Sequence, residues 1–173
     1  MREAAEQDYV EFVTAKLAGM RRLAYLLSGD SHRADDLVQQ TFTALYVRWR
    51  RARTVGHLDA YVRAMLVKAF LSEKRRAWWS RVDVTDSVPE RVPPAGPDPE
   101  DRAVLHAALS RVPARQRAVL VLRFLCDQPV DEVARILGCS PGTVKSQTAH
   151  GLTALRRELD GVAWSPTGIE SRS

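Results

Sequence analysis

The sequence predicts an all-α protein of two small helical domains joined by a proline-rich linker. The first observation is that apolar residues recur three and four positions apart along most of the chain, which is typical of amphipathic helices, while no alternating run of β-branched residues indicates a strand. The second is that five of the nine prolines fall between Pro89 and Pro99, a density that excludes a regular helix or a central strand. The third is the length of 173 residues, which suits one mid-sized domain or two small ones.

Charge divides the chain at the same places. Residues 1–80 carry 14 basic and 9 acidic groups, residues 81–100 carry 2 and 5, and residues 101–173 carry 10 and 7. Two basic domains therefore flank an acidic connector. We expect the domains at residues 1–80 and 100–161, with the linker at 81–99 and a flexible tail at 162–173. One domain with a long surface loop is the alternative, although loops beyond about 15 residues are uncommon within a compact domain.

Three helices are expected in the first domain. Gly29 would end the first helix and Ser31 would cap the second. Their apolar stripes are, in order, Val10, Val13, Leu17, Met20, Ala24 and Leu27; Ala34, Val38, Phe42, Leu45 and Trp49; and Leu58, Tyr61, Val62, Met65, Leu66, Ala69 and Phe70. About 70 residues in three helices are enough to bury a small core.

Four helices are expected in the second domain. Pro113, Pro129 and Pro141 each open a helical pattern, because proline suits the first helical position and loses no hydrogen bond there. A further helix, from about Glu100 to Ser110, precedes them.

The segment VDEVARILGCSPGTVKSQTAHGL has the pattern of a helix-turn-helix. Gly138 would supply the left-handed turn, and Ser140 would cap the second helix. Ala134 is small where two helix backbones approach closely, and Val144 fills the corner from the second helix. This spacing resembles the fold whose second helix enters the DNA major groove.

Polar side chains occupy the outer face of this second helix: Thr143, Lys145, Ser146, Gln147 and His150. Lys145 and Ser146 suit phosphate contacts, whereas Gln147 and Thr143 suit hydrogen bonds to base edges. An ordinary helical hairpin with a solvated polar face is the alternative, and an exposed histidine such as His150 is more often a bystander than a contact.

Two clusters in the first domain also suit binding. The segment DDLVQQTF forms an acidic and amide patch with Asp35, Asp36, Gln39 and Gln40. The segment EKRRAWWSR surrounds two tryptophans, Trp78 and Trp79, with Lys74, Arg75, Arg76 and Arg81. Basic groups bind phosphate and aromatic rings stack on bases, so this second cluster suits unpaired DNA. A helix end whose cations complement the dipole and whose tryptophans close the core is the alternative.

Together these segments resemble a bacterial RNA polymerase sigma factor of the extracytoplasmic-function (ECF) group in the sigma-70 family. DDLVQQTFTALYVRWRR resembles the region 2 helix that grips the polymerase clamp, and AYVRAMLVKAFLSEKRR resembles the segment that meets the −10 promoter element. LSRVPARQRAVLVLRFL and VDEVARILGCSPGTVKSQ resemble region 4, which reads the −35 element. The match runs from about Tyr9 to Leu159.

The resemblance implies three sets of site residues. Core polymerase would contact Asp35, Asp36, Leu37, Gln39, Gln40 and Phe42. The −10 element would meet Lys68, Lys74, Arg75, Arg76, Trp78 and Trp79, and the −35 element would meet Thr143, Lys145, Ser146, Gln147 and His150. Lys68 and Ser72 stand where the family has Asn and often Asp, and Gln147 and His150 stand where arginine is common. We therefore expect weak DNA binding without polymerase.

The implied function is promoter recognition without catalytic chemistry. The second domain would dock on duplex DNA, while the first would hold the polymerase and capture unstacked −10 bases near the loop from Arg51 to Asp59. A linker of about 20 residues with polyproline character reaches roughly 60 Å. At 3.4 Å per base pair this spans about 18 base pairs, so the two domains would read elements nearly two turns apart. The implied partners are core RNA polymerase, promoter DNA and, by kinship alone, an anti-sigma factor.

Composition argues against several other classes. The longest apolar run, Ala118 to Leu122, is far shorter than the ~20 residues that span a bilayer, and the charged N-terminus predicts no signal peptide. Cys126 and Cys139 form no CxxC pair, so we expect neither a disulfide framework nor a metal, and a cytoplasmic location without membrane insertion. Asp35 and Asp36 suit a metal-dependent nuclease poorly, because adjacent residues face different sides of a helix.

A one-component helix-turn-helix regulator with an N-terminal helical sensor domain, which needs a ligand pocket, remains the alternative.

Overall fold

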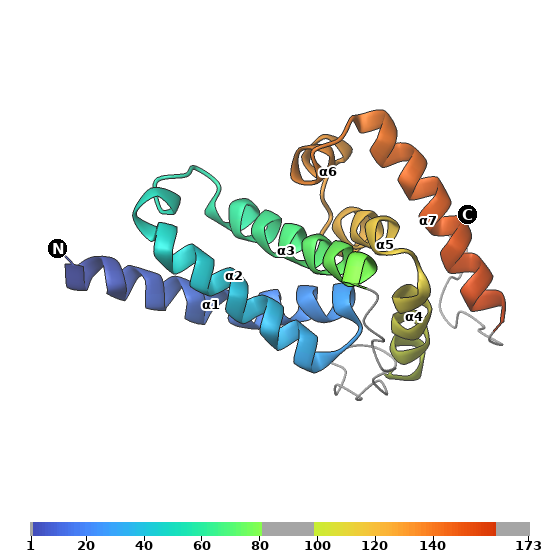
Figure 1. The fold of residues 1–173 in the computed structure, drawn as a ribbon, viewed down its shortest axis with the longest axis horizontal. Coiled ribbons are helices and arrows are strands. Elements are labelled where there is room, and N and C mark those ends of the chain that lie inside the picture. Colours follow the sequence, from blue (N-terminus) through green and yellow to red (C-terminus); the bar gives the residue numbers. More distant parts are fainter. Residues whose placement is uncertain (1, 81–98, 162–173) are drawn as a thin grey trace, which may run out of the picture.

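The computed structural model describes residues 2–80 and 99–161, which form seven α-helices and one short π-helix, with no strand in these two ranges (Figure 1). The predicted all-α fold is confirmed. A first module contains α1 (Arg2–Ser28), α2 (Ser31–Ala52) and α3 (Leu58–Ser80). A second module contains α4 (Pro99–Arg111), α5 (Ala114–Leu120), η1 (Val121–Leu125), α6 (Val130–Leu137) and α7 (Pro141–Asp160). The expected linker, except Pro99, and the expected tail lie outside the described residues, and the domain boundaries stay a prediction.

A tight turn joins α1 to α2. Gly29 has φ 76°, the left-handed conformation that glycine adopts without a steric penalty, and ends α1 where the sequence predicts. The prediction that Ser31 caps α2 is wrong, because the cap is the preceding residue, Asp30. One carboxylate oxygen of Asp30 accepts hydrogen bonds from the backbone amides of His32 at 2.8 Å and Arg33 at 3.1 Å. The positive end of the helix dipole also stabilises an ionised carboxylate at this position.

The core of the first module follows the apolar stripes of α2 and α3. Leu45, Leu66 and Phe70 are all at most 1% exposed. Trp49 is 6% exposed and packs edge-on against Tyr9, with ring centroids 5.3 Å apart, which confirms its expected place in the core.

The α1 stripe is only partly buried. Met20, Leu23, Ala24 and Leu27 are buried, but Val10 is 54% exposed and Leu17 is 40% exposed. The stripe predicted for α1 therefore faces the core from Met20 onward and at the partly buried Val13, but not at Val10 and Leu17. Leu17 lines a groove between α1 and α2 instead of the core.

Proline starts the helices of the second module, although not always at the position expected. Pro141 is the first residue of α7, but Pro113 and Pro129 are the N-caps of α5 and α6, one residue before the first helical position. α5 continues into the π-helix η1, which ends at Leu125, and Asp127, two residues later, has a left-handed φ of 50°. Aspartate tolerates this conformation better than most residues do.

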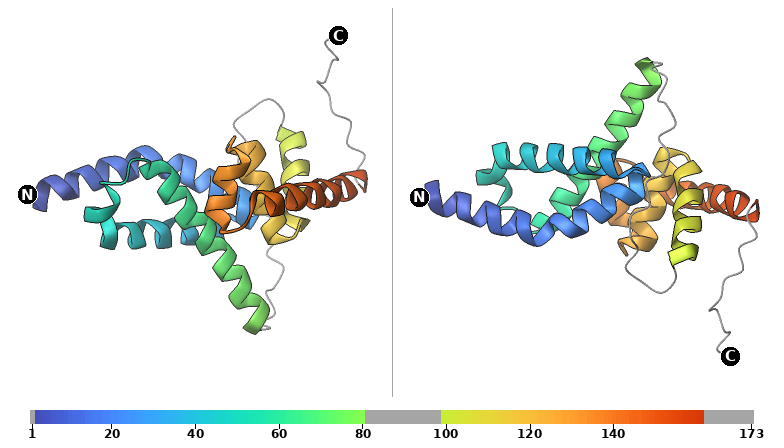
Figure 2. Two further views of the ribbon diagram at one scale, coloured as in Figure 1. Left: turned by 90° about the horizontal axis from the view of Figure 1, so that it is seen from above. Right: turned by 90° about the horizontal axis from the view of Figure 1, so that it is seen from below.

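The two modules pack against each other, and their buried residues form one continuous cluster. α1 contacts α4 and α5, and α3 contacts α5 and α6. Figure 2 shows the second module at one end of the α1–α2 pair, with the C-terminal end of α3 projecting away from both. Within the described ranges, no helix has the length and apolar character needed to cross a membrane.

Candidate functional site

An exposed polar surface lies along α2. Four side chains expected to contact a protein partner are exposed: Asp35, Asp36, Gln39 and Gln40. The other two, Leu37 and Phe42, are 1% and 6% exposed because they fall on the apolar stripe of α2. The structure thus brings all six to one helix, but it places Leu37 and Phe42 beneath the surface, where they support it.

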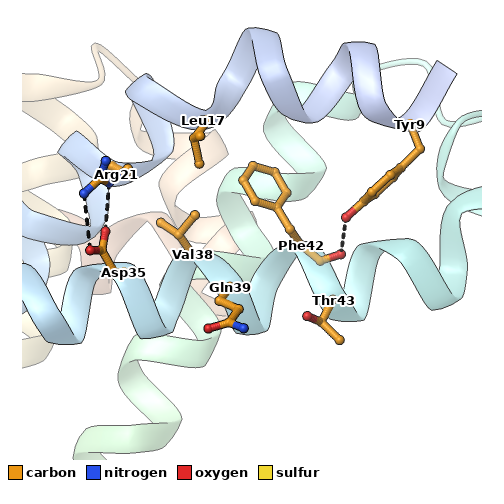
Figure 3. A pocket seen from close by; sticks show the side chains of 8 residues that line it. All are labelled: Tyr9, Leu17, Arg21, Asp35, Val38, Gln39, Phe42 and Thr43. Carbon is orange, nitrogen blue, oxygen red and sulfur yellow. Dashed lines mark hydrogen bonds and ion pairs between the residues drawn. The ribbon is translucent and has the colours of Figure 1, made fainter. Parts of the chain in front are cut away.

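A shallow groove of about 450 Å³ separates α1 from α2 beside this surface (Figure 3). At one end, Arg21 donates hydrogen bonds of 2.8 and 3.2 Å to the two carboxylate oxygens of Asp35. At the other end, the hydroxyl of Tyr9 donates to the carbonyl oxygen of Phe42 at 2.8 Å. Burial, and secondarily Tyr46, raise the pKa of Tyr9, so this hydroxyl stays protonated at neutral pH. The groove therefore has defined polar ends around an apolar middle.

Two apolar residues extend the α2 surface and were missed by the sequence reasoning. Tyr46 is 50% exposed and Val47 is 80% exposed. A second hollow on α2 includes Val47 together with Asp36, Gln39 and Gln40. The available signal was spacing, because Val47 follows Gln40 by seven residues and so lies on the same face of the helix, away from the apolar stripe.

The basic end of α3 forms a separate surface. Lys68, Arg75 and Arg76 are exposed, and Trp78 is 79% exposed, so its ring does not close the core. Lys68 and Arg75 are seven residues apart and therefore share one face. Lys74 differs, because it is half-buried, and burial together with Arg33 and Arg117 lowers its pKa. The side chain of Trp79 and the whole of Arg81 lie outside the described residues.

The helix-turn-helix has the predicted turn. Gly138 adopts φ 63° and ψ 41°, and the amide of Cys139 donates to the carbonyl oxygen of Ala134 at 3.0 Å. Ser140 caps α7, its Oγ accepting a hydrogen bond from the amide of Thr143 at 3.1 Å. Val144 is fully buried at the corner between α6 and α7, as predicted. These contacts fix the angle at which α7 leaves the turn.

The outer face of α7 is accessible. Lys145, Ser146 and His150 are exposed, whereas Thr143 and Gln147 are half-buried. The Thr143 hydroxyl lies 2.9 Å from Ser140 Oγ, so it is already engaged in the cap. On α6, Arg135 pairs with Glu132, and this hydrogen bond lowers the pKa of Glu132. Lys145 is thus an exposed cation at the start of α7.

In the part of the chain that the structure describes, no feature supports metal binding or thiol chemistry. No three histidine, cysteine or acidic side chains there come together as a metal site. Cys126 and Cys139 are both free thiols, and burial raises the pKa of Cys126. Cys126 therefore does not have the lowered pKa that marks a reactive thiol.

Comparison with known proteins matches both modules. The family described as Sigma-70 region 2 matches residues 12–80, and the family described as Sigma-70, region 4 matches residues 102–155. The RNA polymerase sigma-E factor of Streptomyces avermitilis is 32% identical over 158 residues, which cover 88% of this chain and 86% of the relative. The ECF RNA polymerase sigma factor SigE of Mycolicibacterium smegmatis is 32% identical over 164 residues, covering 91% of this chain and 63% of that protein.

Solved structures share the fold. The sigma factor RpoE of Bartonella quintana, determined in complex with the anti-sigma factor NepR, superposes with a TM-score of 0.73 at 24% identity, covering 89% of this chain and 98% of that one. CnrH, determined in complex with the cytosolic domain of CnrY, superposes with a TM-score of 0.57 at 18% identity, covering 94% and 96%. With region 2 and region 4 both matched in order, the chain belongs to the ECF group of RNA polymerase sigma factors, which direct RNA polymerase in transcription initiation.

Proposed function

We propose that this sigma factor binds core RNA polymerase through α2, reads the −35 element with α7 and captures the −10 element with the end of α3. One observation carries the proposal: α7 buries Val144 against the turn while Lys145 and Ser146, on its other side, stay exposed. A helix held at its base with a free polar face has the form that enters a major groove.

The polymerase contact is assigned to the exposed surface of α2. Asp36, Gln40, Thr43 and Val47 follow one another at intervals of about one turn, so they lie on one face of α2. This face therefore carries carboxylate, amide and apolar groups together. A mixed surface of this kind suits a protein partner better than DNA, since a carboxylate repels phosphate. The carboxylate of Asp35 is less available to a protein partner, because it already forms an ion pair with Arg21.

The −10 contact is assigned to the projecting end of α3. Arg75 and Arg76 offer cations to phosphate, and the exposed ring of Trp78 offers a stacking surface for an unpaired base. Lys68 adds a cation two turns earlier on the same side as Arg75. Lys74 contributes less, because it is half-buried and its pKa is lowered by burial and by the cations of Arg33 and Arg117.

The remaining parts of the proposal follow from this role. The chain supplies specificity and no catalytic chemistry, and it works in the cytoplasm, where polymerase and promoter DNA are found. An anti-sigma factor is proposed as a further partner, supported by the complex with the anti-sigma factor NepR in which RpoE was determined.

Run-off transcription tests the function directly. Purified core polymerase with this chain and a promoter library should give start sites that core polymerase alone does not give. The double variant Asp36→Ala with Gln40→Ala should bind core polymerase more weakly. Arg48→Ala, an exposed change on another side of α2, should bind core polymerase as the wild type does.

Two results would separate the proposed function from its alternative. The absence of specific start sites above core polymerase alone would defeat the proposed function. A stable dimer that binds an inverted repeat without polymerase, seen by analytical ultracentrifugation and gel shift, would support a one-component regulator instead.

A further inference from the structure

The C-terminal end of α2 carries an arginine cluster, Arg48, Arg50 and Arg51, to which the proposed function gives no role. All three side chains are exposed. The chain has no acidic residue from position 37 to position 58, so the acidic residues of α2 are confined to its other half. The cluster is therefore a concentrated positive charge at one end of the helix.

The carboxylates near the cluster already have partners. Asp8 on α1 pairs with Arg53 at 3.0 Å, and Asp59 on α3 pairs with Lys16 at 2.8 Å. Within the described ranges, no carboxylate forms an ion pair with an arginine of the cluster. These guanidinium groups are therefore available to an anionic partner.

The cluster stands on a firmly packed part of α2. Trp49 lies between the arginines and is 6% exposed, with ring centroids 5.3 Å from Tyr9 and 5.6 Å from Phe12. Cations in the last turn of a helix also complement its dipole, which is the simpler explanation for Arg50 and Arg51. That explanation does not cover Arg48, which precedes the last turn.

Two members of the cluster share one side of α2. Arg48 and Arg51 are three residues apart and are neighbours on the helix surface, whereas Arg50 projects from nearly the opposite side to Arg48. Arg51 follows Phe42 by nine residues, or two and a half turns, so it faces away from the α1–α2 groove that Phe42 lines. It also lies one turn beyond Val47, so this pair of cations begins where the surface assigned to the polymerase ends.

A line of side chains on α3 leads toward this pair. Arg75, Lys68 and Tyr61 follow one another at intervals of seven residues and therefore share one face of α3. Arg75 and Lys68 are exposed and Tyr61 is half-buried. The line spans 14 residues, or about 21 Å, which a strand at 3.4 Å per nucleotide covers with about six nucleotides. Residues 53–57 then connect the start of α3 to the end of α2 (Figure 1).

The order of the chain gives this line a direction on the promoter. The C-terminal end of α3 leads through the connecting segment to the second module, to which the upstream −35 element is assigned. The start of α3 and the end of α2 are therefore at the downstream end of the line, on the side of the transcription start site.

We propose that Arg48 and Arg51 bind phosphates of the unpaired strand immediately downstream of the −10 element. The proposal rests on the function assigned above, since it extends the strand that α3 holds. Contacts to phosphate position a strand without reading its sequence, so this surface adds grip and no further base preference. Arg48 lies off the face assigned to the polymerase, so its loss leaves the binding of core polymerase unchanged.

The test compares two single strands bound by the holoenzyme. One ends at the last base of the −10 element of a promoter identified by transcription, and the other continues downstream for six thymidines. The variant is Arg48→Ala with Arg51→Ala. Arg22→Ala with Arg111→Ala removes two exposed arginines from α1 and α4 and is the matched control. A third chain, Arg48→Lys with Arg51→Lys, keeps both charges.

The expected effect is confined to the extended strand and is measured by fluorescence anisotropy over a range of salt concentrations. Each phosphate contact on a single strand contributes about 0.7 to the slope of log K against log salt concentration. Loss of both arginines should therefore lower the slope by about 1.4. Raising salt from 50 to 200 mM should then weaken the binding of the extended strand about sevenfold less in the variant than in the control. The short strand should bind equally to both, and the lysine variant should keep the slope of the wild type.

Three results would overturn the proposal. The first is an extended strand whose salt slope is the same for the alanine variant and the control. The second is a lysine variant that loses as much slope as the alanine variant, because charge would then not be the contact. The third is loss of core polymerase by the alanine variant in a pull-down, which would assign these arginines to the polymerase.

Failure of the proposed function would look different. If the wild-type holoenzyme does not bind the short strand, the assignment of the −10 element to α3 fails. If the short strand is bound and only the slope difference on the extended strand is missing, the assignment to α3 stands and the downstream contact alone is wrong.

Discussion

Gly151 in α7 lies directly against Leu120 in α5. A β-carbon built at position 151 would come within 3.1 Å of Leu120 Cγ and within 3.3 Å of both Leu120 methyl carbons. Gly151 is buried in the middle of a 20-residue helix, where glycine lowers helix stability relative to alanine. The close crossing accounts for glycine at this position and fixes where α7 passes over α5.

Gly151→Val should therefore destabilise the chain by about 1–3 kcal/mol, the usual cost of overpacking a well-filled core. Chemical denaturation of both chains measures this difference. Gly19→Ala is the control, because Gly19 lies in α1 with open space around its Cα. That change should be neutral or stabilise the chain by up to about 1 kcal/mol. Equal stability of Gly151→Val and the wild type would show that α5 and α7 can move apart at no cost.

Sequence reasoning succeeded where structure depends on neighbouring residues. The turn of the helix-turn-helix was predictable because Gly138, Ser140 and Val144 each act through contacts within a few positions. It was less accurate at the start of α2. Asp30 and Ser31 have similar preferences for the N-cap position, so the sequence does not show which of the two neighbours caps the helix.

Contacts between distant segments were not predictable. Nothing in the sequence distinguishes Arg117 from arginines that lie at the surface. Its burial depends on the end of α1, 90 residues earlier. The exposure of Val10 and Leu17 likewise depends on how far α2 covers α1. Leu37 and Phe42 show a related limit, because family resemblance assigns a residue to an interface without distinguishing surface contacts from the core that supports them.

Asp30→Ala should cost about 1 kcal/mol of stability, because it removes the side chain that accepts hydrogen bonds from the amides of His32 and Arg33. Asp30→Asn keeps an oxygen in the same place and should recover most of that loss. Denaturant midpoints of the two variants measure the difference. If Asp30→Asn is as unstable as Asp30→Ala, the negative charge rather than the hydrogen bonding is what stabilises the start of α2.

Lys145→Ala should weaken binding to −35 DNA and flatten its dependence on salt. A lysine that neutralises one phosphate contributes about one unit to the slope of log K against log salt concentration. Fluorescence anisotropy with the holoenzyme and a −35 duplex, over a range of salt concentrations, measures this slope. Lys16→Ala is the control, since Lys16 pairs with Asp59 in the first module and should leave the slope unchanged. An unchanged slope for Lys145→Ala would place the phosphate contacts elsewhere.

Arg75→Ala combined with Arg76→Ala should slow promoter opening without weakening the binding of core polymerase. Both arginines lie on the projecting end of α3, away from the α2 surface assigned to the polymerase (Figure 2). Fluorescence of 2-aminopurine placed in the −10 element reports opening, and a pull-down reports core binding. Arg22→Ala, an exposed change on α1, is the control for loss of positive charge. Loss of core binding in the double variant would mean that the two surfaces have been assigned the wrong way round.

Acid should loosen the packing of α4 against α1 through His106, whose ring stacks on Tyr25. Burial lowers the pKa of His106, as does the cation of Arg117, while its bond to the Tyr25 carbonyl opposes them. A histidine whose pKa is lower when the modules are packed binds more protons when they separate. Its contribution to the packing is therefore complete above its ordinary pKa of about 6.5 and is lost as the pH falls below that value.

The scattering radius of the free chain should therefore increase between about pH 7 and pH 5.5. His106→Gln tests this assignment, since glutamine retains a donor for the Tyr25 carbonyl but does not titrate. A pH response as large in His106→Gln as in the wild type would assign the response to another group.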